Sequence, residues 1–153
     1  MRNVLSNPLA SQRRYGLRTA KIALGALGLL VSAFTSAADL TINLTNIERS
    51  EGMVQIAIDG SVADFRKTRL HGIQKPATRG KMTIVVNDLP EGEYAVLVYQ
   101  DLDGNGKLDT NLIGIPKEPW GGSVQGKSVI GGPGWNDAKF RLPAGGLAVE
   151  IGL

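Results

Sequence analysis

Cysteine is absent from this 153-residue sequence, and histidine occurs once, as His71. Without cysteine the protein forms no disulfide bond, carries no lipid on a cysteine and has no thiol nucleophile, and a zinc site lacks its usual ligands. No serine stands in a nucleophile-elbow motif, and Asp101 and Asp109 belong to one turn, whereas glycoside hydrolysis needs carboxylates across a cleft. We therefore expect no catalytic residues and no enzymatic activity, and we interpret His71 as a solvent-facing loop residue.

Acidic residues are missing from residues 1–38, which contain five basic ones. Residues 39–153 contain 12 Lys and Arg against 14 Asp and Glu, a balance of −2, so the overall charge of +3 comes from the amino-terminal segment. The larger segment is thus not a net-basic module of the kind that binds nucleic acid, and we expect no nucleic-acid partner.

A hydrophobic run long enough to span a bilayer is also missing. Residues 22–34 form an uncharged apolar run of 13 residues, which as a helix would cover about 20 Å of the roughly 30 Å hydrocarbon core. Basic residues precede the run, and small residues including Ala37 and Ala38 follow it, as in a cleaved export signal. We predict a signal-peptide helix in 1–38, a single domain in 39–153, a periplasmic or secreted location, and no stable membrane insertion after cleavage.

After residue 38 no convincing amphipathic helix is found. Short segments instead alternate apolar and polar residues, with Gly, Pro and Asn in the turns between them, and this pattern predicts an all-β sandwich. We expect the first two segments to form an antiparallel hairpin. The expected strands are 40–47, 53–59, 81–89, 93–100, 138–142 and 147–153.

Residues 59–80 show no sustained period and contain five Lys or Arg residues. We interpret them as a long loop anchored by Phe65 and Leu70. The basic residues form either an ordinary solvated surface or a rim that receives an anionic ligand. The connection 101–136 is too long to be featureless, so we expect an ordered loop there.

The start of that connection, DLDGNGKLD at 101–109, is its most distinctive part. Its Asp, Asn and Gly residues are spaced as at positions one, three, five, six and nine of an EF-hand-type calcium loop. Lys107 would supply a backbone carbonyl at position seven, and Glu118 is the nearest candidate for a further ligand. The candidate metal ligands are Asp101, Asp103, Asn105, Lys107, Asp109 and Glu118.

Two features oppose a calcium site. Position twelve is Leu112 in place of the usual bidentate glutamate, and no helix flanks the loop. The alternative is a metal-free turn, because Asp and Asn side chains with left-handed glycines stabilise long β connections by themselves. Both interpretations stay open, with calcium as the possible cofactor.

Two tryptophans, Trp120 and Trp135, bracket a glycine-rich stretch. Such aromatics either plug one end of a sandwich or form a flat platform for a sugar or a peptide. Together with Lys117 they are the candidate ligand-binding residues. Tyr94 stands in a corner pattern, in which its ring packs and its hydroxyl bonds to nearby backbone.

Residues 88–123 contain LPEGEY at 89–94, NGKLD at 105–109 and GIPKEP at 114–119, and AKFRL follows at 138–142. In these motifs the chain resembles a family of exported bacterial proteins known as domain of unknown function 2141, over about residues 40–153. The resemblance implies a transthyretin- or prealbumin-like β-sandwich of no established activity. Together with the strand pattern it predicts an immunoglobulin- or transthyretin-like antiparallel sandwich of about seven strands.

Our first hypothesis is an exported, non-enzymatic binding or accessory module of the cell envelope. Its long loops would present Trp120, Trp135, Lys117 and Glu118 to a glycan, a peptide or an outer-membrane protein. The alternatives are a purely structural envelope domain without a ligand, and a hydrolase whose residues are not recognised.

Overall fold

The computed structural model describes residues 37–67, 71–124 and 132–153. The predicted signal-peptide helix therefore lies outside the described residues, apart from Ala37 and Ala38, and so does Leu70. Within the described ranges, no helix is long and apolar enough to cross a membrane.

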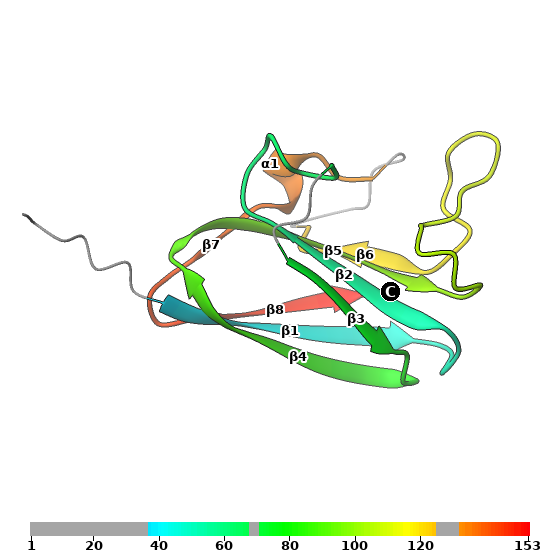
Figure 1. Ribbon diagram of the computed structural model, residues 1–153, viewed down its shortest axis with the longest axis horizontal. Helices are drawn as coiled ribbons and strands as arrows, with labels where there is room; N and C mark the ends of the chain where they lie inside the picture. Colours follow the sequence, from blue (N-terminus) through cyan, green and yellow to red (C-terminus); the bar gives the residue numbers. More distant parts are fainter. Residues whose placement is uncertain (1–36, 68–70, 125–131) are drawn as a thin grey trace, which may run out of the picture. The chain divides into compact units, whose positions relative to one another are not determined.

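Two β-sheets form the fold (Figure 1). The three-stranded sheet has the order β4–β1–β8, with strands Gly80–Pro90, Ala37–Ile47 and Leu147–Gly152. The five-stranded sheet has the order β3–β2–β5–β6, and β7 pairs with the start of β5. Its strands are β3 (His71–Pro76), β2 (Met53–Asp59), β5 (Gly92–Asp101), β6 (Trp120–Gly122) and β7 (Phe140–Leu142), and the short helix α1 (Trp135–Ala138) precedes β7.

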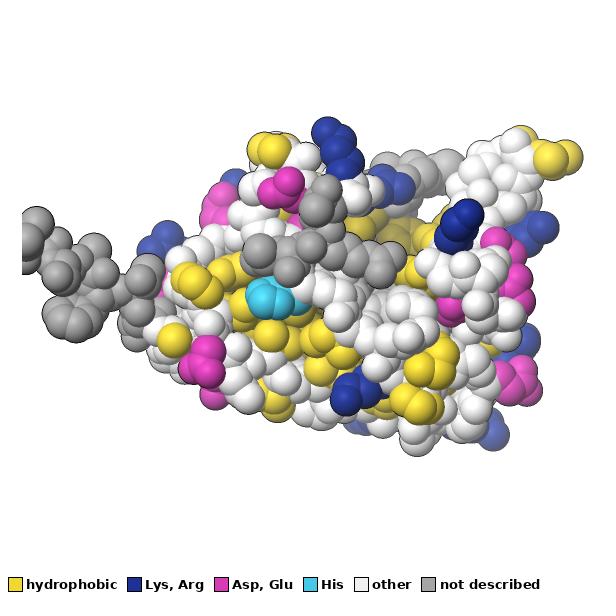
Figure 2. All heavy atoms as spheres, in the orientation of Figure 1, with side chains coloured by type: hydrophobic (Ala, Val, Ile, Leu, Met, Phe, Trp, Pro, Cys, Tyr) yellow, Lys and Arg dark blue, Asp and Glu magenta, His cyan; other side chains and the backbone are white. Residues whose placement is uncertain are grey.

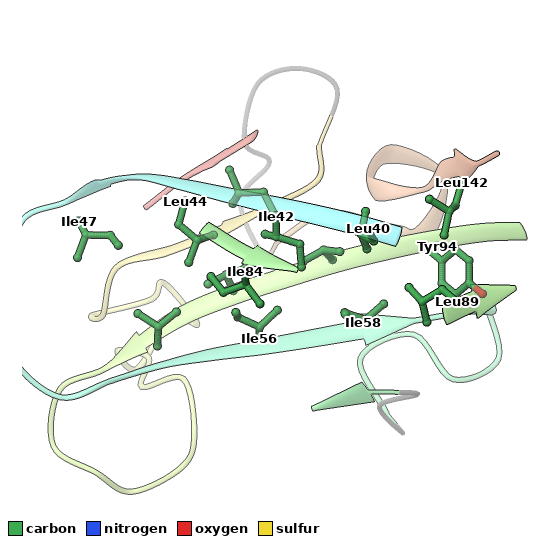
Figure 3. Packing of buried hydrophobic residues seen from close by; sticks show 14 of the residues in the cluster. Leu40, Ile42, Leu44, Ile47, Ile56, Ile58, Ile84, Leu89, Tyr94 and Leu142 are labelled. Atoms are coloured by element: carbon green, nitrogen blue, oxygen red, sulfur yellow. The ribbon is translucent and has the colours of Figure 1, made fainter. Parts of the chain in front are cut away.

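The alternating sequence pattern explains how the two sheets pack. Leu40, Ile42 and Leu44 of β1 are fully buried, and Ile56 and Ile58 of β2 meet them from the other sheet (Figure 3). Each such aliphatic side chain contributes about 1.5–3 kcal/mol by leaving water. The predicted all-β sandwich is thus confirmed, with an aliphatic core.

The expected hairpin between the first two strands is wrong. β1 belongs to the three-stranded sheet and β2 to the five-stranded sheet, so the turn between them crosses from one layer to the other. Gly52 ends this turn with a φ of 69°, and a Cβ there would overlap the backbone of Asp101. Both strands bury one face in the same core, which is why alternation alone does not separate this arch from a hairpin.

The pairing of β1 with β8 is parallel, a feature that the expected antiparallel sandwich did not include. Leu40 pairs with Leu147 and Leu44 with Ile151. The parallel pair arises because β8 returns to the three-stranded sheet after a long excursion through the other one. The remaining pairs, including β1 with β4, are antiparallel.

The segment 59–80 is not only a loop, since β3 occupies residues 71–76. His71, expected in a loop, is the first residue of this strand and is exposed. β3 pairs with β2 along one side only and half-buries only Ile73. An edge strand that buries so few side chains shows no apolar–polar alternation in its sequence, so this pattern does not predict it.

Two smaller features fix the ends of the sandwich. The Tyr94 hydroxyl donates a hydrogen bond of 2.8 Å to the Pro90 carbonyl, as the corner pattern predicts, and burial raises the pKa of Tyr94. At the other end β6 approaches β8 closely, because a Cβ on Gly121 would overlap the Gly152 carbonyl. Glycine at this position lets the two sheets meet.

Candidate functional site

Asp101, the last residue of β5, organises the Asp-rich loop. The residue is 1% exposed. Its Oδ1 accepts the backbone N–H of Gly104 at 2.8 Å, while its Oδ2 accepts that of Gly106 at 2.9 Å and the Gln55 amide at 3.4 Å. The two glycines have φ angles of 78° and 73°, which allow the chain to curl around the carboxylate.

Opposing effects set the pKa of the Asp101 carboxyl. Burial raises the pKa, because the charged form loses contact with water. The hydrogen bonds described above, led by that from Gly106, lower the pKa, and the result lies below the ordinary aspartate value. Asp101 is therefore ionised at neutral pH, and its negatively charged carboxylate accepts the hydrogen bonds that hold the loop.

Glu118, which follows the Asp-rich loop in the sequence, also holds this loop by hydrogen bonds. It is buried, its Oε1 accepts the N–H of Leu102 at 2.8 Å, and its Oε2 accepts the N–H of Asp109 at 3.0 Å. The Lys117 N–H also donates to the Asp109 carbonyl at 2.8 Å. The two ends of the loop are thus tied together by one carboxylate and one backbone bond.

The exposed part of the loop is an Asx turn. The Asn105 amide donates to Asp103 and to Asp109 at 3.0 Å each, and its Oδ1 accepts the Lys107 N–H at 2.7 Å. The Tyr99 hydroxyl donates to the Gly106 carbonyl at 2.8 Å. These bonds are those by which Asp and Asn side chains stabilise turns without a metal.

The same loop meets the size requirement for a cation. Carboxylate oxygens of Asp101, Asp103 and Glu118 lie within 4.8 Å of one another, and Asp109 is not part of this group. Two oxygens that bind one calcium ion at about 2.3–2.6 Å are at most about 5 Å apart. Calcium stays a prediction, for which these three carboxylates are the ligands that the geometry offers.

A pocket of about 350 Å³ lies on the outer face of the five-stranded sheet. Its floor contains Ala57 of β2 and Leu97 of β5, which are opposite each other in the strand ladder. Tyr99 and Trp120, another cross-strand pair, lie beside them. Because the side chain of Ala57 is small, the centre of this face is recessed. Figure 2 shows a hollow with hydrophobic atoms at its base.

Loops form two walls of the pocket, and both walls carry cationic side chains. One wall is the Asp-rich loop and its continuation, and the other combines the turn after β2 with the segment before α1. The Arg66 side chain extends toward the segment before α1, since a Cβ on Gly132 would lie 3.4 Å from the Arg66 guanidinium group. The wall residues are Lys107, Leu108, Thr110, Gly114 and Pro116 on one side, and Asp59, Arg66, Lys67, Gly132 and Pro133 on the other.

The structure places the candidate ligand-binding residues in different settings. Trp120 lines the pocket. Trp135 packs edge-on against Phe65, with ring centroids 5.6 Å apart and planes at 73°, in a small cluster with Ala95 and Ala138. Lys117 is exposed and does not line the pocket.

Sequence reasoning missed most of the pocket. Leu97 and Tyr99 belong to the expected strand 93–100 but are not among the predicted site residues, and Lys107 is predicted to contribute only its carbonyl. One available signal was a small outward residue, Ala57, in a strand followed by a basic segment. That signal does not say which loop covers the face, because the loop positions depend on the strand order.

The lobe beyond the pocket wall is an ordered turn with an apolar tip. The Asn111 side chain accepts the N–H groups of Ile113 at 3.0 Å and Ile115 at 2.9 Å, and Thr110 bridges to Pro116. Leu112 and Ile113 are exposed to solvent. The turn therefore holds aliphatic side chains away from the sandwich.

Fold and site together define a β-sandwich protein with a loop-walled pocket on one outer face. A family model described as "Uncharacterized protein conserved in bacteria (DUF2141)" matches residues 42–150, and the chain belongs to this family. The comparisons with curated proteins and with solved structures found no match.

Proposed function

We propose that the protein is an exported, non-enzymatic binding module of the bacterial cell envelope, whose ligand seat is the pocket on the outer face of the five-stranded sheet. The observation that carries the proposal is the pocket itself. A volume of about 350 Å³ lies in the range of small-ligand sites. Trp120 and Tyr99 offer aromatic surface, which loses little conformational entropy on binding.

The hydrogen bonds of the buried carboxylates support a binding role over catalysis. A general acid or base needs a carboxyl that can exchange a proton with a substrate. Asp101 and Glu118 instead accept backbone N–H groups through both of their oxygens. Their work in this proposal is to hold the loop that walls the pocket, and calcium at these residues would stiffen the same wall.

Among the candidate partners, a glycan of the envelope fits best. One recurring mode of peptide binding uses a free sheet edge, where main-chain groups are available. The pocket floor is the face of a sheet, and its strands β2, β5 and β6 are paired to one another. Recognition therefore falls to side chains and loop backbone. A peptide, an outer-membrane protein or no ligand at all are alternative outcomes of the test.

The test is binding to arrays of envelope glycans and of peptides, with the wild type, Trp120→Ala and Trp135→Phe. Truncating a central tryptophan typically costs 2 kcal/mol or more, so we expect Trp120→Ala to weaken binding about 30-fold or more. The control Trp135→Phe keeps an aromatic ring against Phe65 and leaves binding unchanged. Thermal melts confirm that both variants fold.

Three results would contradict the proposal. Binding that survives Trp120→Ala places the ligand elsewhere, and an absence of binders favours the structural domain. Turnover on a panel of hydrolase substrates, lost in Asp101→Ala, would establish the hydrolase instead.

A further inference from the structure

The charged groups that line the pocket are mostly cationic. Three positive side chains, Arg66, Lys67 and Lys107, face one carboxylate, that of Asp59. Asp59 is buried, and its Oδ2 accepts the Arg66 N–H at 3.3 Å. Among the described residues, no ion pair involves Lys67 or Lys107. The lining therefore has a formal charge of +2, which suits an anionic ligand.

Both lysines extend from ordered backbone, on opposite walls. Lys107 follows Gly106, whose N–H is held by Asp101 and whose carbonyl is held by Tyr99. The Lys67 N–H donates to the Asp64 carbonyl at 2.8 Å. The backbone that carries each lysine is therefore already in place when a ligand arrives, and only the lysine side chains have to be ordered. Figure 2 shows Lys and Arg side chains on both sides of the hollow.

The space between the cations is apolar and suits a ring. Trp120, Leu97 and Ala57 provide a low hydrophobic surface on the sheet. Thr110 and the backbone of Gly114 and Gly132 lie above it and offer polar groups at the rim. A pyranose presents one apolar face and a perimeter of hydroxyl groups, which is the pattern that this lining complements.

From these observations we infer that the pocket takes an acidic sugar, a carboxylate-bearing pyranose within an envelope glycan. The ring stacks on Trp120, and the carboxylate lies between Lys107 and Lys67. The inference rests on the proposed function and adds the chemical class of the ligand. Lys107 and Lys67 become the residues that determine specificity for acidic over neutral sugars.

The experiment is isothermal titration calorimetry of the purified protein with trisaccharides of galacturonate, glucuronate and mannuronate. The fully methyl-esterified form of each is the matched neutral probe, because it keeps the ring and removes the charge. We expect at least one acidic trisaccharide to bind, and its ester to bind at least about tenfold more weakly, as the loss of a charge-assisted hydrogen bond predicts.

Variants assign the effect to the pocket. Lys107→Gln and Lys67→Gln should each lower the affinity for the acid about tenfold and leave that for the ester unchanged, whereas Lys107→Arg keeps most of the affinity. The control is Lys75→Gln, an exposed lysine on β3 that does not line the pocket; it should have no effect.

The inference is overturned if acid and ester bind equally, if none of the acidic trisaccharides binds, or if Lys75→Gln weakens binding as much as Lys107→Gln does. Array binders that are neutral or peptidic, yet lost in Trp120→Ala, would refute the acidic-sugar class and leave the proposed function standing. An array without binders would remove both.

Discussion

The two faces of β5 show how one strand can serve both stability and binding. Val96 and Val98 point into the sandwich and are at most 2% exposed. Leu97 and Tyr99, the residues between and beside them, are half-buried and line the pocket on the other side. The inner face is filled by aliphatic side chains of two sheets, whereas the outer face is covered by loops and, at Ala95 and Leu97, by the small cluster that contains Phe65, Trp135 and Ala138.

This difference separates two kinds of order. The core is held by apolar area removed from water, which is non-directional and spread over many residues. The pocket wall that the Asp-rich loop forms is held by hydrogen bonds to a few carboxylates, chiefly those of Asp101 and Glu118. Changes inside the sandwich should therefore alter global unfolding, and changes at the carboxylates should alter the wall first.

The largest expected effect is on the inner face. Ile56→Ala should lower the free energy of unfolding by about 2–5 kcal/mol, because it leaves a cavity in a packed core. Urea denaturation measures the change. The control Val85→Ala alters a residue that is 51% exposed and should stay within about 0.5 kcal/mol. Equal losses in the two variants would contradict the assignment of Ile56 to the core.

Asp101→Asn should have the next largest effect, confined mainly to the wall. The substitution keeps the shape but places an amide N–H against a backbone N–H of Gly104 or Gly106. We expect a lower melting temperature than wild type and faster hydrogen exchange at these two amides, measured by NMR. Asp103→Asn, at an exposed position, is the control. Unchanged exchange in Asp101→Asn would remove Asp101 as the organiser of the loop.

Calcium should have a smaller effect on the same wall if the predicted ligand set is correct. With a dissociation constant of about 0.5 mM, about 5 mM calcium would stabilise the fold by about 1.4 kcal/mol, or a few degrees in melting temperature. Melts with calcium, magnesium and a chelator measure this shift. Superimposable curves would leave the loop as an Asx turn alone.

The smallest effect is a pH dependence that comes from Asp101. Its pKa in the folded protein is lowered, so its contribution to stability is complete above the unfolded aspartate pKa of about 3.9 and is lost as the pH falls through the folded pKa. The difference in stability between wild type and Asp101→Asn should therefore shrink below about pH 4. Urea unfolding of both proteins at neutral and acidic pH tests this, and a constant difference would contradict it.

Much of the sandwich could be predicted from the sequence, because burial of one strand face leaves a period of two. Leu40, Ile42 and Leu44 alternate with polar residues in the expected strand 40–47, and all three are buried. The sheet to which each strand belongs could not be predicted in the same way. β1 and β2 face one core from opposite layers, and their pattern is that of a hairpin.

The site was predictable only in part. The spacing of Asp101, Asp103 and Asn105 shows from the sequence that the chain turns tightly, and the hydrogen bonds confirm the turn. The pocket depends on which loops cover the outer face, and this follows from strand order and loop path. Lys67 and Lys107 are far apart in the chain, and only the fold brings them to one cavity.

The parallel pairing of β1 with β8 has a consequence for how the protein is made. β1 is the central strand of its sheet, and its neighbour β8 is translated about 100 residues later, a separation typical of slow-folding topologies. Until the strand at 147–152 has been synthesised, β1 lacks its parallel neighbour and the three-stranded sheet cannot be completed. Under the export that we propose, such late closure would favour a chain that is still unfolded when it enters a translocation channel.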